Sequence, residues 1–133
     1  MDVEALPAGE YLLPGPGRDR LVAAVRAGRK TATTALAADY ERCGEPWPRR
    51  GDLEAVVDSA GRRVAITRVV AVESCRLAEV DDAHVRAEGE GFADLASWRQ
   101  AHEAFWRQVL PDLEIDDDTI VVCVRFELVE LVG

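Results

Sequence analysis

The sequence predicts an α+β fold in which a mixed, largely antiparallel sheet or small β-barrel packs against flanking helices. About five segments show the alternating, β-branched pattern of strands, and three or four show the apolar spacing of helices. These segments do not alternate strictly, as they would in a parallel βαβ fold. The length of 133 residues suits a single domain, residues 1–133, with one continuous core.

The first part of the chain is expected to be irregular and then helical. Residues 1–18 form an irregular N-terminal leader with a strong breaker at residues 14–17. A helix begins at Asp19 and ends before Gly28, since glycine is favoured just after a helix. Its apolar positions recur at helical spacing: Leu21, Val22 and Val25.

Turn residues divide the middle of the chain into short elements. Residues 30–34 are extended, and residues 35–43 form a short helix. Residues 53–58 and 63–73 are strands, joined by a hairpin connection at residues 59–62.

Two helices and a strand complete the prediction. The first helix is capped by Asp81 or Asp82 and ends at Gly89. The second helix starts near Asp94, and residues 119–132 form a long terminal strand. The apolar face of the second helix carries residues in three- and four-residue steps: Leu95, Trp98, His102, Phe105 and Val109.

Charge and composition restrict the partners. The net charge of −9, without any block of Lys and Arg, argues against extended duplex binding, because phosphate neutralisation supplies most of that affinity. A small cationic pocket for one nucleotide remains compatible with this charge. No apolar run approaches the roughly 20 residues that span a bilayer, and no signal peptide is recognisable, so we expect a cytoplasmic protein without a membrane partner.

Metal and cofactor sites are not expected. The three cysteines are far apart in the sequence, and no pair has C-x-x-C spacing. The two histidines lack a third clustered ligand, although Glu88 follows His84 by four residues.

The segment Gly28-Arg29-Lys30-Thr31 carries the first candidate chemistry. It is not a phosphate-binding P-loop, because the upstream glycine is missing and the segment follows a helix. Partial burial disfavours the charged form of a lysine, so Lys30 could activate a hydroxyl of Thr31, Thr33 or Thr34, or a water. The structural alternative is a solvated lysine that complements the helix dipole.

A second candidate is Glu88-Gly89-Glu90-Gly91. Two carboxylates between flexible glycines can approach a ligand closely, and one could act as a general acid or base. The alternative is a helix C-cap with surface acids. His102 is interpreted as a hydrogen-bonded core or cleft-edge histidine and Trp98 as a core residue, whereas Trp47 could stack on a base or simply pack.

These clusters, in this order, resemble the ASCH family. The resemblance covers residues 21–131. The segments that resemble the family are Gly28-Arg29-Lys30-Thr31-Ala32-Thr33, Glu45-Pro46-Trp47-Pro48 with Gly51-Asp52, Ala87-Glu88-Gly89-Glu90-Gly91, Ser97-Trp98-Arg99 with His102 and Phe105-Trp106, and Val121-Val122-Cys123-Val124-Arg125-Phe126. Membership implies a PUA-like fold, a small β-barrel with flanking helices, and an RNA-related role.

The resemblance also implies a chemistry. One ASCH branch hydrolyses the acetyl amide of acetylcytidine with a Lys, a Thr and a Glu, which match Lys30, Thr33 and Glu90 here, with Glu88 as the second choice for the acid. The ligand would be contacted by neighbouring residues: Arg29, Thr31, Trp47, Glu88, Trp98 and His102. Two positions depart from the branch pattern, since Val124 and Phe92 stand where it usually has acids.

Three functions are therefore compatible with the sequence. The first is an amidohydrolase acting on a nucleoside-like small molecule, and it requires no cofactor. The second is a non-catalytic module that binds single-stranded RNA or a nucleotide, and the third is a ribonuclease. The acidic charge weakens the second and third.

Overall fold

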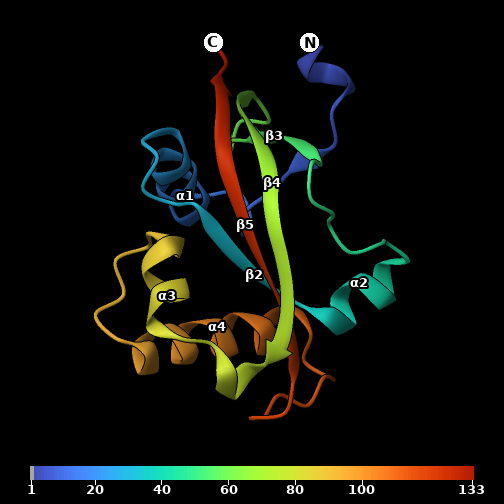
Figure 1. Cartoon of the computed structure of the whole chain (residues 1–133), viewed down its shortest axis with the longest axis vertical. Coiled ribbons are helices and arrows are strands. Elements are labelled where there is room, and N and C mark those ends of the chain that lie inside the picture. Colours follow the sequence, from blue (N-terminus) through green and yellow to red (C-terminus); the bar gives the residue numbers. More distant parts are fainter. Residues whose placement is uncertain (1) are drawn as a thin grey trace.

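The computed structural model describes residues 2–133, which form an α+β fold around a five-stranded sheet (Figure 1). The strand order is β1-β3-β4-β5-β2, and every neighbouring pair is antiparallel except the parallel pair β1 and β3. The elements in chain order are the 3₁₀ turn η1 (Val3–Ala5), β1 (Ala8–Gly9), α1 (Pro16–Arg26), β2 (Ala32–Leu36), α2 (Ala37–Cys43), β3 (Leu53–Val57), β4 (Arg63–Arg76), the 3₁₀ turn η2 (Leu77–Glu79), α3 (Asp82–Glu88), α4 (Leu95–Val109) and β5 (Ile120–Leu131).

The predicted α+β class and the mixed, largely antiparallel sheet are confirmed. The sheet is not closed into a barrel, because its edge strands β1 and β2 do not pair among the described residues. The long strands β4 and β5 form its centre, and α1, α3 and α4 lie along one side of them in Figure 1, with α2 on the other.

The leader is more regular than expected. Of residues 1–18, Met1 lies outside the described residues, and the rest include η1, β1 and the start of α1. The prediction of a helix from Asp19 was therefore three residues late. Pro16 stands in the first turn of α1, where its missing N–H costs no hydrogen bond and its fixed φ favours the helix. The breaker sequence is thus a helix start.

The helix ends follow the predicted chemistry. Asp81 and Asp94 cap α3 and α4, accepting hydrogen bonds from the backbone N–H groups of His84 and Ser97. The C-cap residue of helix α1 is Ala27, and Gly28 follows it with a left-handed φ of 78°. Glycine is needed here because other residues rarely adopt this conformation.

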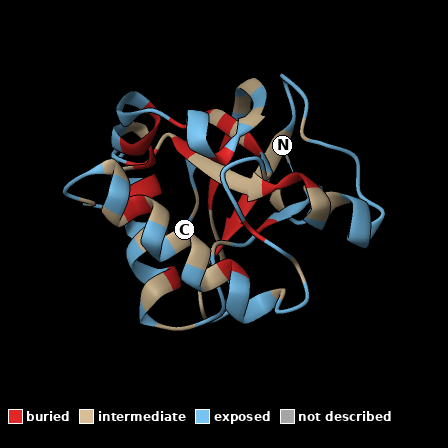
Figure 2. Ribbon diagram, turned by 90° about the horizontal axis from the view of Figure 1, so that it is seen from below, coloured by how far each residue is buried: buried red, intermediate tan, exposed pale blue. Residues whose placement is uncertain are grey.

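Buried side chains form three clusters on the sheet. One lies under α3 and α4 and includes Trp98 and Trp106, a second lies under α1 and includes Val25 and Phe126, and a third is smaller and adjoins α2. Figure 2 shows the helices with buried residues facing inward and exposed residues facing outward. Within residues 2–133, no helix is long and apolar enough to cross a membrane.

Candidate active site

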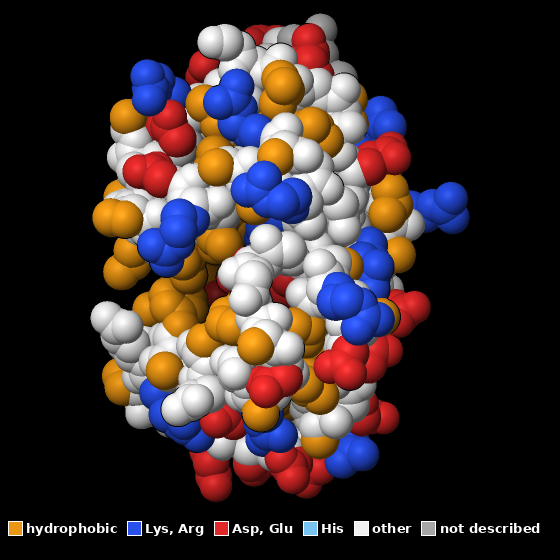
Figure 3. Space-filling model, turned by 90° about the vertical axis from the view of Figure 1, so that its left-hand side faces the viewer, with side chains coloured by type: hydrophobic (Ala, Val, Ile, Leu, Met, Phe, Trp, Pro, Cys, Tyr) orange, Lys and Arg blue, Asp and Glu red, His pale blue; other side chains and the backbone are white. Residues whose placement is uncertain are grey.

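A cavity of about 650 Å³ lies where the three clusters meet. Its lining comes from the segment around β1, from strands β2 to β5, and from α1, α2 and α4. The face of the molecule in Figure 3 is hollowed, with hydrophobic side chains around the hollow and acidic atoms visible inside it. The volume is sufficient for a small organic ligand of nucleoside size.

Lys30 lies in the wall of this cavity and is only 1% exposed. Its ammonium donates hydrogen bonds to the Ala32 carbonyl at 2.8 Å, to Glu90 Oε2 at 2.8 Å and to the Glu88 carbonyl at 3.4 Å. Three acceptors match the three N–H groups of an ammonium. All three N–H groups of the Lys30 ammonium are therefore used within the site.

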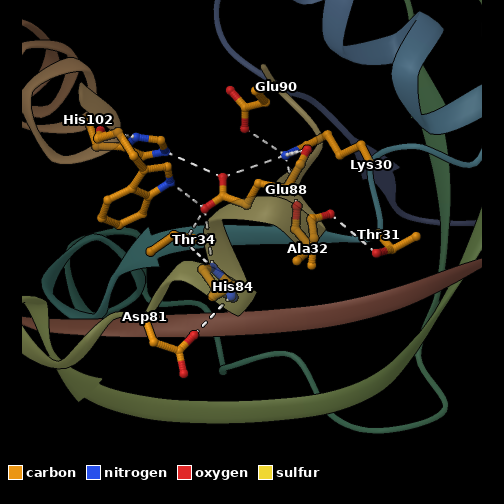
Figure 4. A network of polar contacts seen from close by, with 11 residues as sticks. Lys30, Thr31, Ala32, Thr34, Asp81, His84, Glu88, Glu90 and His102 are labelled. Atoms are coloured by element: carbon orange, nitrogen blue, oxygen red, sulfur yellow. Dashed lines mark hydrogen bonds and ion pairs between the residues drawn. The ribbon is translucent and has the colours of Figure 1, made fainter. Parts of the chain in front are cut away.

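Glu88, at the end of α3, is the centre of the polar network in Figure 4. It is 1% exposed, and its Oε2 accepts hydrogen bonds from the Thr34 hydroxyl at 2.8 Å and from the Trp98 indole at 2.7 Å. Its Oε1 lies 3.7 Å from the Lys30 ammonium. Burial alone would raise the pKa of Glu88, but hydrogen bonds from His102 and His84 and the Lys30 charge hold that pKa well below its usual range.

His102 completes the network from α4. Its Nδ1 is 2.8 Å from the Trp98 carbonyl, which can only accept, so Nδ1 carries a proton. Its Nε2 faces Glu88 Oε1 at 3.5 Å. Burial lowers the pKa of His102, but the hydrogen bond and charge of Glu88 outweigh burial and raise that pKa overall. The carboxylate of Glu88 thus stabilises the protonated form of His102 relative to a free imidazole.

Glu90 is the second acid at the cavity and is less buried than Glu88, with 15% of its side chain exposed. Burial raises the pKa of Glu90, the Lys30 charge opposes this, and the nearby Glu88 adds to the increase. The net effect is a raised pKa, as expected for a carboxyl that shares one cation with a second carboxylate. The two neighbouring carboxyls therefore differ in their environment, since the pKa of Glu88 is lowered and that of Glu90 is raised.

Gly89 allows both carboxylates to reach Lys30. It has a φ of 63°, and a Cβ at this position would collide with the Arg29 carbonyl. The Thr31 N–H also donates to the Ala87 carbonyl at 2.7 Å, which fixes the end of α3 against the residues before β2. Glu88 and Glu90, on either side of Gly89, thus both face the Lys30 ammonium.

The other predicted site residues occupy different positions. Thr33 lines the cavity, and its hydroxyl makes no hydrogen bond within residues 2–133. Trp98 is fully buried and acts through Glu88, and Thr31 donates from its hydroxyl to the Ala87 carbonyl at 3.2 Å, so neither lines the cavity. Arg29 and Trp47 are exposed and also lie outside the lining. The structure brings Lys30, Glu88, Glu90 and His102 together at the cavity. It places Arg29 and Trp47 away from its lining.

Several residues of the site were not among the predicted ones. Thr34 accepts from His84 Nε2 at 2.6 Å while donating to Glu88, so both belong to the network. Tyr11 comes from the supposed leader, and its ring centroid lies 5.5 Å from the Lys30 ammonium. Glu54 lines the cavity from β3. Thr34 was a candidate hydroxyl beside Lys30, and His84 was marked by its four-residue spacing from Glu88, whereas Tyr11 and Glu54 carried no signal in the sequence.

Glu88, Glu90 and His102 have donor atoms within 4.8 Å of one another, as a metal site would. The Lys30 ammonium, however, already bonds to Glu90 and faces Glu88. A divalent cation bound to these carboxylates would meet the Lys30 charge at close range. The donor set does not fit a metal ion while Lys30 is in place.

This fold and cavity belong to the PUA-like class of small α+β proteins. The model of the ASCH domain matches residues 10–130, and the chain belongs to the ASCH family. It is similar to the ASCH domain of Lactobacillus crispatus JV V101, with a TM-score of 0.85 and 25% identity over 92% of this chain and 79% of that chain.

Two other solved structures extend the comparison. A protein from Enterococcus faecalis V583 has a TM-score of 0.85 and 28% identity over 98% of this chain and 80% of that chain. An ASCH protein of Zymomonas mobilis, with 7% identity and a TM-score of 0.53 over 86% of this chain and 70% of that chain, shares the fold alone. No curated protein matches the chain in sequence.

Proposed function

We propose that this protein hydrolyses an acyl amide on a nucleoside-sized ligand, with a modified nucleoside such as acetylcytidine as the first substrate to test. The observation that carries the proposal is the buried ion pair at the cavity wall, where the Lys30 ammonium lies 2.8 Å from Glu90 Oε2. It joins a fixed positive charge to a carboxyl that can exchange a proton. Amide hydrolysis needs both.

The steps follow from these two groups. Glu90 takes a proton from a water or from the Thr33 hydroxyl, whose oxygen then bonds to the amide carbon. The Lys30 ammonium stabilises the negative oxygen of the tetrahedral intermediate. Glu90 returns the proton to the nitrogen, the C–N bond breaks, and the amine leaves. With water, the products are a carboxylic acid and the amine; with Thr33, an ester forms and a water hydrolyses it by the same steps.

Glu88 and His102 support this chemistry indirectly. Glu88 is ionised and saturated by Thr34, Trp98 and the two cations, so it holds Lys30 in position without competing for the proton. The protonated His102 balances the second carboxylate charge. We therefore assign both as positioning residues.

The charge of the cavity favours a ligand without phosphate. The lining contains one lysine and six carboxylate residues: Glu10, Asp39, Glu45, Glu54, Glu88 and Glu90. Phosphates of single-stranded RNA would be repelled, because nucleic-acid binding depends on cationic neutralisation. This supports a nucleoside-like small molecule over the RNA-binding module and the ribonuclease.

The test is release of acetate and cytidine from acetylcytidine by the pure protein. Lys30→Met and Glu90→Gln should each lower kcat/KM by about 100-fold or more, the usual contribution of such groups. Arg20→Met, an exposed change on α1, is the matched control and should retain activity. Absence of turnover at high protein concentration would contradict the proposal, and RNA binding that weakens steeply with salt would support the RNA-binding alternative.

A further inference from the structure

The cavity has a second polar region away from Lys30. Glu54 on β3 and Thr67 on β4 are direct cross-strand partners, and both line the cavity. Tyr11 and Tyr40 line the same cavity, and burial, with the Glu54 charge as the second cause, raises the pKa of each. The Glu90 charge also acts on Tyr11, which therefore lies near both polar regions.

Thr67 provides the second polar group of this region, a side-chain hydroxyl. The residue is 3% exposed, and its hydroxyl makes no hydrogen bond with the part of the chain that the structure describes. Within the same residues, no fully buried polar side-chain atom lacks a partner, so the Thr67 oxygen must be open to the cavity. The Thr67 oxygen is therefore accessible from the cavity, next to the side chain of its cross-strand partner Glu54.

Glu54 likewise has no cationic partner in residues 2–133. Burial and the charge of Asp52 raise its pKa to about 7. The chain makes room for this carboxyl at Gly9, because a Cβ there would collide with it. Glu54 is half-buried, and a partly buried carboxylate without a cationic partner is unfavourable for folding. Such groups are retained where they serve binding or catalysis.

We propose that Glu54 and Thr67 form a second subsite that binds a positively charged amine, so that the cavity takes a cationic amide such as an N-acylated diamine. The ammonium would donate to the Glu54 carboxylate and to the Thr67 oxygen, with the Tyr11 and Tyr40 rings beside it. The acyl amide would lie toward Lys30 and Glu90. This amide end rests on the proposed function, whereas the ammonium subsite requires binding alone.

Lys30 forms no ion pair with Glu54 among the described residues, and pairs instead with Glu88 and Glu90. Its three donors are already used by Ala32, Glu88 and Glu90. The excess of carboxylates in the lining therefore attracts a cationic group on the ligand, and this group adds binding free energy that a neutral or anionic group does not.

The experiment compares two ligands that differ only in one charge. Calorimetric titration at pH 8 would use N-acetylputrescine, which is cationic, and N-pentylacetamide, which replaces the ammonium by a methyl group. The intact protein should bind the cation about tenfold more tightly or better. Glu54→Gln should abolish this preference while still binding the neutral amide, and Thr67→Val should reduce it severalfold.

An exposed substitution, Glu127→Gln, controls for loss of overall negative charge and should keep the preference. The preference should also weaken below about pH 7, where Glu54 gains a proton near Asp52, Tyr11 and Tyr40. Equal affinity for the two ligands, no binding of the cation at millimolar concentration, or a preference that survives Glu54→Gln would overturn the inference. If the charge preference is found but neither amide nor acetylcytidine is hydrolysed, the proposed function fails and the subsite stands.

Discussion

Replacing Glu88 by glutamine tests whether one buried carboxylate organises the site. Glu88 is 1% exposed and interacts with two cations, Lys30 and His102, and with the donors of Thr34 and Trp98. Glutamine keeps the shape and one acceptor oxygen but removes the charge. It also turns an N–H₂ group toward groups that are themselves donors.

The magnitude follows from these partners. Removing one partner of a buried ion pair costs about 3–5 kcal/mol, and the retained acceptor oxygen lowers this to about 2–4 kcal/mol. At this chain length, such a loss corresponds to a decrease in Tm of about 10 °C.

The assay is urea and thermal unfolding followed by circular dichroism, at several pH values. The pKa of folded Glu88 is lowered, so its contribution is present above the unfolded carboxyl pKa of about 4.3 and is lost as the pH falls below it. The difference between the native protein and Glu88→Gln should therefore narrow in acid. Glu127→Gln, which breaks an exposed pair with Arg68, should cost less than about 1 kcal/mol. Equal stabilities of the two variants at pH 7 would refute the assignment.

Two further predictions concern stability. The pKa of Glu54 is raised to about 7, so its ionisation opposes folding, and the free energy of unfolding should fall as the pH rises from about 4.3 to about 7. Glu54→Gln should remove this slope and be more stable than the native protein at pH 8 by about 1–3 kcal/mol in urea unfolding. An unchanged slope would contradict the assignment. Gly89→Ala should cost about 2–4 kcal/mol in the same assay, because φ is 63° and the Cβ meets the Arg29 carbonyl. Gly61→Ala, with φ of 81° but open space around it, should cost about 1 kcal/mol, and similar losses in both would show that the collision is relieved.

Local patterns predicted most of the fold. Helix ends were marked by residues whose preference is set by a few neighbours, such as Asp81, Asp94, Gly28 and Gly89. Sheet closure could not be predicted in this way, because it depends on whether edge strands far apart in the sequence meet. The start of α1 was misplaced because Pro16 is compatible both with a breaker and with a first helical turn.

The candidate site was predictable where its residues are near one another in sequence or on one helix face. Lys30, Glu88, Glu90 and His102 were singled out on this basis, and the network joins all four. Glu54 and Thr67 gave no signal, since a lone acid or hydroxyl in a strand is ordinary. Their importance comes from cross-strand pairing and from burial in a cavity, which a single sequence does not display.

The central position of β5 has a consequence for biosynthesis. This strand lies between β4 and β2, so the N-terminal β2 has no neighbour in the sheet until residues 120–131 are available. During translation, β3 and β4 can form a hairpin early. The backbone of Lys30 is held by the earlier Ala24, but its ammonium bonds to Glu88 and Glu90, which are made later. We therefore expect the sheet around the candidate site to be complete only after β5 has emerged from the ribosome.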